Sequence, residues 1–518
     1  AKETTTMPFP LPLATLQVAT LILVVSCSLL LLSRTQTKKH PADRRLPPSP
    51  PCLPIVGNLH QLSALPHRAL HALAVAHGPV MLLHLGRVPT LVVSSADAAR
   101  EVLQLQDHAF ANRPSLAIPR RLLYGCTDIA FAPHGAYWRS VRKLAVLHLL
   151  SPGRVHAYRS VREEEVAKLV RRVEEEQAHG GGVVRLSKLL GGFAKDVNGR
   201  IVLGVRASGA AGWRAKVDAL LEEANALLGA FHVGDYFPWL AWVATVDGTD
   251  AKVSRAFERI DRILEEIVDV AASTGVGGCR CEDKAFVHVL LSLQRESSET
   301  GFRLSRNNVK ALLEDLFGAG TDSTIIVLEW VMAELLRNKP VMQKLQQEIR
   351  RHYTKTSHLL MITEQDLPVM EYLRAVIKET MRLHPPGPLL VPRESMKHAR
   401  VQDYHAPSGT RVIVNAWAIG RDPAAWEHVG EFWPERFINS KVDFRGQHSQ
   451  LIPFGAGRRM CPGVGFTTTV VELTLANLVG HFDWAVPPSV VVDMEEAPGV
   501  TSRKRVPIYA VATVALHE

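Results

Sequence analysis

Residues 454–463 read Phe-Gly-Ala-Gly-Arg-Arg-Met-Cys-Pro-Gly, and a helical run begins directly after them, near Val464. One cysteine, Cys461, therefore lies among glycines and arginines. Glycines let a chain fold tightly around a bulky group. Free N–H groups at a helix start, together with arginines, lower the pKa of a thiol. A lone buried cysteine is usually inert, but this setting favours a functional thiolate.

A second segment places polar residues inside an apolar helix. Residues 305–337 have apolar side chains on nearly all sides, with Ser305 at an N-cap position, which predicts a buried helix about 50 Å long. Its middle reads Ala-Gly-Thr-Asp-Ser-Thr at 319–324. A carboxylate and three hydroxyls cost several kcal/mol there unless they are hydrogen-bonded. The segment alone leaves two interpretations open: a ligand-facing groove, or a satisfied polar contact between helices.

The cysteine segment resembles the cytochrome P450 superfamily. The Phe-x-x-Gly-x-Arg-x-Cys-x-Gly signature of that family is matched at Phe454, Gly457, Arg459, Cys461 and Gly463. The resemblance implies that Cys461 is the axial thiolate ligand of the iron of haem b, that Arg459 pairs with a haem propionate, and that Phe454 packs beside the sulfur. A thiolate ligand favours O–O bond cleavage, which the haem performs while the protein tunes and shields it.

Further segments match the family in the expected order. Trp138 and Arg142 resemble its Trp-x-x-x-Arg haem contacts, and Arg393 occupies the place of another propionate contact. Together with the cysteine segment, these residues make up the predicted haem site.

Three residues resemble the ion network of the family. Glu379 and Arg382 match its Glu-x-x-Arg pair, and Arg436 matches the arginine that completes the network. Their i,i+3 spacing puts Glu379 and Arg382 on one helix face. Without the resemblance, this spacing predicts an ordinary surface salt bridge.

The polar middle of the long helix resembles the oxygen-side segment of the family, with one departure. The usual threonine after the acid is Ser323 here, which keeps the hydroxyl and loses a methyl group. Asp322, Ser323 and Thr324 are therefore predicted to relay protons, with the efficiency of coupling in question. By resemblance, candidate pocket residues are Phe317, Ala319, Leu389, Leu390, Val500 and residues 115–126.

The beginning of the chain predicts a membrane anchor. Residues 11–32 are mostly apolar and uncharged, close to the ~20 residues that a spanning helix needs. Basic residues follow this run, which by the positive-inside rule keeps the bulk of the chain in the cytosol. We expect an anchor at 1–33, a basic and proline-rich hinge at 34–57 that acts as a stiff spacer, and a catalytic domain at 58–518. The implied location is the endoplasmic reticulum membrane, with a single pass.

The remaining pattern predicts a mainly α fold with a small β subdomain, the fold of the P450 superfamily. A hairpin is expected from residues 80–85 and 90–94. Residues 274–283 are expected to form a loop. Helices are expected at 67–77, 139–150, 158–176, 213–228 and 251–272.

Composition excludes several classes. The chain has 518 residues, 60 Lys and Arg against 51 Asp and Glu, and six cysteines, which excludes a disordered or disulfide-dense protein. The basic residues form no stripe, so a nucleic-acid partner is not expected. Cys279 and Cys281 have no matching second pair for zinc. The spacing of His67 and His71 predicts an exposed helix face.

The resemblance covers the whole chain and is similar to plant A-type microsomal members, with weaker similarity to grass enzymes of specialised metabolism. It implies a monooxygenase that hydroxylates a small lipophilic metabolite with O₂. Electrons would come from NADPH through a reductase, with cytochrome b5 as a second candidate donor. Arg139, Lys143 and Arg458 are candidates for the docking surface. An O₂-independent rearrangement, or a haem sensor or electron-transfer role, stays open as an alternative.

Overall fold

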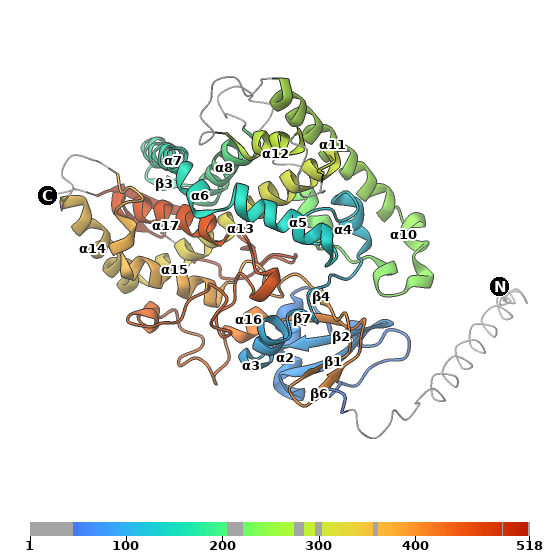
Figure 1. Ribbon diagram of the computed structural model, residues 1–518. Coiled ribbons are helices and arrows are strands. Elements are labelled where there is room, and N and C mark those ends of the chain that lie inside the picture. Colours follow the sequence, from blue (N-terminus) through green and yellow to red (C-terminus); the bar gives the residue numbers. More distant parts are fainter. Residues whose placement is uncertain are drawn as a thin grey trace, which may run out of the picture.

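The computed structural model describes residues 45–204, 221–273, 284–295, 303–355, 361–488 and 490–515. Helices make up most of this part, and the strands form three small sheets, as the sequence predicts. The largest sheet lies at one end of the helical body (Figure 1). The predicted anchor, the start of the hinge up to residue 44, residues 213–220 and the loop at 274–283 with Cys279 and Cys281 lie outside the described residues.

The largest sheet joins segments that are far apart in the sequence. Its strand order is β1 (Val80–Leu85), β2 (Val88–Val93), β7 (Arg411–Val414) and β4 (Arg393–Glu394). The predicted hairpin is β1–β2, and β7 runs parallel to β2. Arg393 therefore opens a strand that β7 fixes in place. The smaller sheets consist of β3 (Val183–Val184), β9 (Ala510–Val514) and β8 (Phe482–Ala485), and of β5 (Ala399–Val401) and β6 (Tyr404–Ala406).

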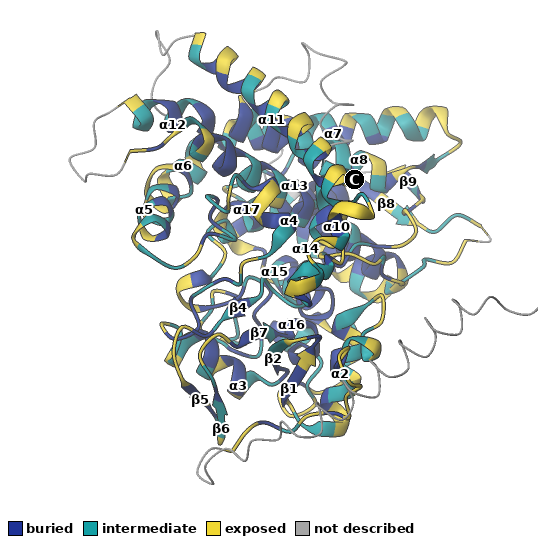
Figure 2. Cartoon of the chain, turned by 90° about the vertical axis from the view of Figure 1, so that its right-hand side faces the viewer, coloured by how far each residue is buried: buried dark blue, intermediate teal, exposed yellow. Residues whose placement is uncertain are grey.

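The long helix α13 (Arg306–Arg337) runs through the core and organises the helical body (Figure 2). It starts at Ser305, whose side chain forms a capping box with Asn308, as its sequence favours. The helix packs against α8 (Leu186–Asn198), α15 (Glu371–Leu383) and α17 (Val464–His481). Among the described residues, α13 alone is long and apolar enough to cross a membrane, but 61% of its most apolar window is buried in the protein. It is a core helix.

The remaining helices follow the predicted pattern closely. The expected helix at 139–150 is α5, which continues as a π-helical turn over residues 145–149. Of the expected helix at 213–228, the described residues 221–228 are helical. The bounds are α2 (Pro66–His77), α3 (Ala96–Arg100), α4 (Ala117–Leu122), α5 (Ala136–Leu144), α6 (Pro152–Ala157), α7 (Arg159–His179), α10 (Val243–Val246), α11 (Thr249–Ser273), α12 (Phe286–Arg295), α14 (Lys339–Lys355) and α16 (Ala416–Ile419).

The two histidines of α2 correct one prediction. His67 is buried and its Nε2 lies 2.9 Å from a carboxylate oxygen of Glu496, so an exposed helix face is wrong. The rings of His67 and His71 both pack against Trp417 on α16. Spacing within α2 could not reveal this contact, because its partners lie more than 340 residues away in the chain.

The described part of the hinge, residues 45–57, lies against the largest sheet. The N–H of Leu82 on β1 donates to the carbonyl of Pro48 at 3.0 Å, and Gly57 forms a bridge with Leu85. Backbone contacts thus attach the proline-rich stretch to the globular body.

Candidate active site

The cysteine loop is held in a tight conformation between the sheet end and α17. The N–H of Cys461 donates to the carbonyl of Phe454 at 2.9 Å, which closes the loop on itself. Gly457 has a φ of +67°, and a Cβ there would lie 1.8 Å from the carbonyl oxygen of Leu103. Only glycine fits at position 457 without displacing the backbone of Leu103.

The protein surroundings of Cys461 shift the pKa of its thiol. Its side chain is accessible, yet burial raises the pKa of the thiol, and the charge of Asp315 on α13 adds to that rise. The N–H of Gly463 and the guanidinium of Arg142 act in the opposite direction but do not outweigh burial. The predicted lowering by a helix-start N–H and by an arginine is present, but burial outweighs both, so the predicted net lowering of this pKa is wrong. A cation bound to the sulfur would stabilise the thiolate that burial disfavours.

Four arginines lie around the cysteine loop. The sequence analysis predicts haem contacts for three of them, Arg142, Arg393 and Arg459. Arg142 on α5 donates to the carbonyl of Met460 at 2.6 Å, next to Cys461. Arg459 donates to the carbonyls of Ala111 and Ala132, and its guanidinium lies 4.0 Å from the centre of the Trp138 ring. Buried Arg393 donates through Nη2 to Ala456, and its Nη1 has no partner.

Arg113 is the fourth arginine, and the sequence analysis missed it. It is buried and donates to the carbonyls of Ala130, Val391 and Pro392. Burial and the charges of Arg393 and Arg459 hold its pKa well below the ordinary value. The position of Arg113 just before a proline gives no indication of a function. Only the folded structure shows that Arg113 belongs to this group.

In the part of the chain that the structure describes, none of these four guanidiniums forms an ion pair with a carboxylate, although Asp107, Asp128 and Asp315 act on some of them from a distance. Burial lowers the pKa of Arg393 to about 10, and burial and neighbouring arginines lower that of Arg459 to about 9. Of the carboxyls nearby, buried Asp128 has a pKa raised to about 7 by burial and by Asp315. An anionic group placed here would stabilise the cationic arginines.

One small residue in the middle of α13 is exposed. Ala319 is exposed although the helix runs through the core, and Asp315 of the same helix is close enough to raise the thiol pKa of Cys461. The hydroxyl of Ser323 donates to the carbonyl of Ala319 at 2.8 Å, and that of Thr324 donates to Gly320 at 2.7 Å. Ser323 is partly exposed, so its oxygen can accept a hydrogen bond from water, whereas Thr324 is fully buried.

Asp322 does not contact Ser323. Thr501 donates to its Oδ2 at 3.0 Å, and Arg503 forms an ion pair with its Oδ1. The structure thus brings the predicted hydroxyls and acid to one stretch of helix but directs the acid toward a loop near the C-terminus. The sequence analysis assigned no role to Arg503 or Thr501.

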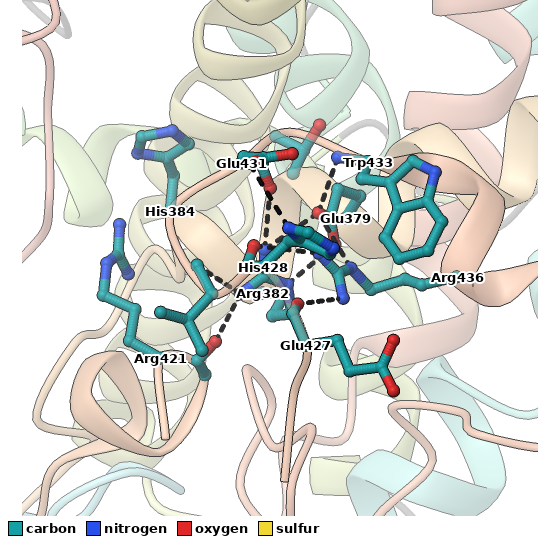
Figure 3. Close-up of polar contacts among 12 residues, drawn as sticks. Glu379, Arg382, His384, Arg421, Glu427, His428, Glu431, Trp433 and Arg436 are labelled. Atoms are coloured by element: carbon teal, nitrogen blue, oxygen red, sulfur yellow. Dashed lines mark hydrogen bonds and ion pairs between the residues drawn. The ribbon is translucent and has the colours of Figure 1, made fainter. Parts of the chain in front are cut away.

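The predicted ion network is buried (Figure 3). Arg382 donates to both oxygens of Glu379 at 2.7 and 2.8 Å, and Nε of Arg436 donates to Oε1 at 3.1 Å. The backbone N–H of Trp433 donates to the same oxygen at 2.8 Å. Because the Glu379 and Arg382 side chains are 0% exposed, the interpretation as a surface salt bridge is wrong.

The candidate pocket residues lie on different elements. Phe317 is buried on α13, and Val500 lies beside Gly229, where a Cβ would be 3.3 Å from its Cγ2. Leu389 packs against the cluster around β1, and Leu390 against the cluster that includes Ala456. Leu390 also has a φ of +53°, a conformation that branched residues adopt rarely.

Comparisons with known proteins show the family of the chain. Residues 47–510 match the family model described as Cytochrome P450. The chain belongs to the cytochrome P450 family. It is 48% identical over 461 residues to Cytochrome P450 71A1 of Persea americana, covering 88% of this chain and 91% of that one.

Other relatives support the same assignment for this P450. It is 45% identical over 476 residues to norfluorocurarine oxidase of Strychnos sp., covering 90% and 92% of the two chains. A zebra fish cytochrome P450 solved with progesterone aligns with a TM-score of 0.74 and 25% identity, covering 86% and 99%. The chain is therefore a plant-type P450 monooxygenase that uses haem iron.

The residues around Cys461 fit a haem. The unpartnered Nη1 of buried Arg393, and the arginines without a carboxylate ion pair in the described part of the chain, suit the propionates of its porphyrin. The accessible thiol of Cys461 suits an axial ligand.

Proposed function

We propose that this P450 hydroxylates a small lipophilic specialised metabolite, using O₂ and electrons that NADPH supplies through a separate reductase. The observation that carries the proposal is the group of buried and half-buried arginines around an exposed Cys461. Apolar Phe317 and exposed Ala319 lie on the core helix α13, which suits a lipophilic substrate.

The haem would supply the oxygen-activating chemistry. The residues of the chain would hold the haem and deliver protons. Cys461 would ligate the iron, with Phe454 and Gly463 shaping the loop around the sulfur. The haem propionates would be contacted by Arg142, Arg393, Arg459 and Trp138. The hydroxyls of Ser323 and Thr324 would position water, and Asp322 would provide the proton. Phe317, Ala319, Leu389, Leu390 and Val500 would contribute to substrate selection.

The reductase would dock near the cysteine loop. Arg139 and Lys143 are exposed on α5 four residues apart, and Arg458 is 54% exposed in the loop itself. Burial lowers the pKa of His134, and the charges of Arg459, Arg139 and Arg458 lower it further, so Arg139 and Arg458 lie near the same histidine. A face that carries these cations would attract an acidic partner, either the reductase or cytochrome b5. The anchor at 1–33 would hold the enzyme on the endoplasmic reticulum with its catalytic domain in the cytosol.

Reconstitution of the full chain in vesicles with an NADPH-dependent P450 reductase tests the proposal. A panel of lipophilic plant metabolites is supplied with ¹⁸O₂, and we expect NADPH-dependent product that carries one ¹⁸O atom. Product formed without NADPH and without label would indicate an O₂-independent rearrangement. Absence of any turnover across the panel, in a protein that is reduced normally, would favour an electron-transfer or sensor role.

Salt dependence tests the docking face separately. The rate of reduction is expected to fall as ionic strength rises, and more weakly in Lys143→Gln than in wild type. Arg87→Gln is the matched control, because Arg87 is an exposed cation in the β1–β2 turn. A rate that is indifferent to salt would contradict docking at this face.

A further inference from the structure

The segment 499–503 contacts three different parts of the site within five residues. Val500 lies against Gly229, where an added Cβ would be 3.1 Å from the backbone nitrogen of Val500. Thr501 and Arg503 both bind the carboxylate of Asp322. Ser502, between them, is buried. One short loop therefore joins Val500, a candidate pocket residue, to the acid of the predicted proton relay.

Ser502 fixes the loop at its centre. Its hydroxyl donates to Glu496 at 2.8 Å, and its carbonyl accepts from the indole N–H of Trp330 on α13 at 2.7 Å. Its own N–H donates to the carbonyl of Pro386 at 2.9 Å. Because these three hydrogen bonds hold Ser502, Thr501 and Arg503 can leave the carboxylate of Asp322 while the loop stays in place.

The carboxylate of Asp322 and the hydroxyl of Ser323, the predicted members of the relay, already have other hydrogen-bond partners. Asp322 uses one oxygen for Thr501 and the other for Arg503, and Ser323 donates its only proton to Ala319. A proton can pass from Asp322 to a water at Ser323 only after the carboxylate leaves at least one loop partner. The Arg503 side chain is 36% exposed, so solvent reaches this ion pair from the outside.

We propose that Arg503 and Thr501 form a latch on Asp322, a pair of contacts that must open before Asp322 delivers a proton, and that the loop links the packing of Val500 to this opening. This inference rests on the proposed monooxygenase function. When the latch opens, Oδ1 of Asp322 takes a proton from bulk water and passes it to a water at the Ser323 hydroxyl; no electron moves. Arg503 keeps its own protons and binds the carboxylate again. Arg503 is a positioning residue, since it acts through Asp322.

Arg503→Gln tests the latch, with Arg505→Gln as the matched control. Arg505 is two residues away and 54% exposed, and it pairs with Asp493 and Glu495 instead of Asp322. In the holoenzyme, hydrogen exchange of amides 500–503 is expected to rise about two- to fivefold in Arg503→Gln, the range for one partly exposed ion pair. The control and Arg503→Lys should exchange like wild type.

Consumption of NADPH by the reductase-coupled enzyme without substrate gives a second readout. It is expected to rise about two- to fivefold in Arg503→Gln, and to return to the wild-type rate when Asp322→Asn is added. Gly229→Ala, whose Cβ crowds the loop at Val500, should raise both readouts in the same direction.

Equal behaviour of Arg503→Gln and Arg505→Gln in both readouts would overturn the latch. So would a rise in NADPH consumption that survives Asp322→Asn. If wild type itself consumes no NADPH with the reductase, the proposed function fails, and hydrogen exchange still decides whether Arg503 holds the loop. If Arg503→Gln does not fold, Thr501→Val and Gly229→Ala carry the same comparison against Arg505→Gln.

Discussion

Glu379→Gln is expected to destabilise the protein strongly, because it removes the only charge that balances two buried guanidiniums among the described residues of the network. Glu379 accepts four hydrogen bonds, two from Arg382 and one each from Arg436 and the Trp433 backbone. The side chains are 0%, 0% and 6% exposed for Glu379, Arg382 and Arg436. Breaking a buried pair of this kind costs about 3–5 kcal/mol, because the remaining charges stay buried.

The matched control is Glu431→Gln in the adjacent loop. The Glu431 side chain is 71% exposed and lies 3.4 Å from His428, while its backbone carbonyl accepts from Arg382. Its substitution keeps that carbonyl and should change the free energy of unfolding by less than about 0.5 kcal/mol.

Urea unfolding followed by tryptophan fluorescence measures both variants. Trp426 and Trp433 are local reporters, because their rings lie 5.5 and 5.0 Å from the guanidiniums of Arg382 and Arg436. Adding Arg436→Met to Glu379→Gln should recover part of the loss, since one uncompensated charge disappears. A Glu379→Gln protein within about 0.5 kcal/mol of Glu431→Gln would refute the reasoning.

Three further predictions concern single residues. Gly457→Ala should abolish haem incorporation, measured by the haem-to-protein absorbance ratio, because its Cβ would collide with Leu103; Gly465→Ala, with open space around it, should not. Although burial raises it, hydrogen bonds from His67, Arg68 and Ser502 lower the pKa of Glu496 to about 2. Its stabilisation, at most about 3 kcal/mol, should be present above pH 4.5 and be lost as pH falls toward 2, so the unfolding free energies of wild type and Glu496→Gln should converge on acidification; a constant gap would contradict this. Ser323→Ala should raise peroxide release per NADPH, and Ser323→Thr should not; unchanged coupling in Ser323→Ala would shift the role to Thr324 or to water alone.

Local signals in the sequence were sufficient to predict the helices and strands and to locate the cysteine loop. The periodicity and cap of residues 305–337 predicted α13, and the hairpin at 80–94 followed from β-rich runs around a turn. The family resemblance, and not spacing, placed Arg436 with Glu379 and Arg382, and the structure joins the three by hydrogen bonds.

The sequence analysis could not predict contacts between residues that are far apart in the chain. Burial of Arg113 and the pairing of Asp322 with Arg503 depend on segments 181 or more residues apart, which no spacing within one motif encodes. One signal was available: Asp315 stands in the same apolar helix as the polar segment at 319–324. The reasoning applied to that segment would also have marked Asp315, whose carboxylate accepts from the N–H groups of Ile129 and Ala130.

The central claim is that the sulfur of Cys461 is the axial ligand of a haem iron. The most direct measurement is the carbon monoxide difference spectrum of the dithionite-reduced full-length protein, recorded for wild type and for Cys461→Ala, with Cys126→Ala as the control. We predict the red-shifted band of a thiolate-ligated haem in wild type and in the control, and its loss in Cys461→Ala. Persistence of that band in Cys461→Ala would show that another residue ligates the iron and would contradict the account.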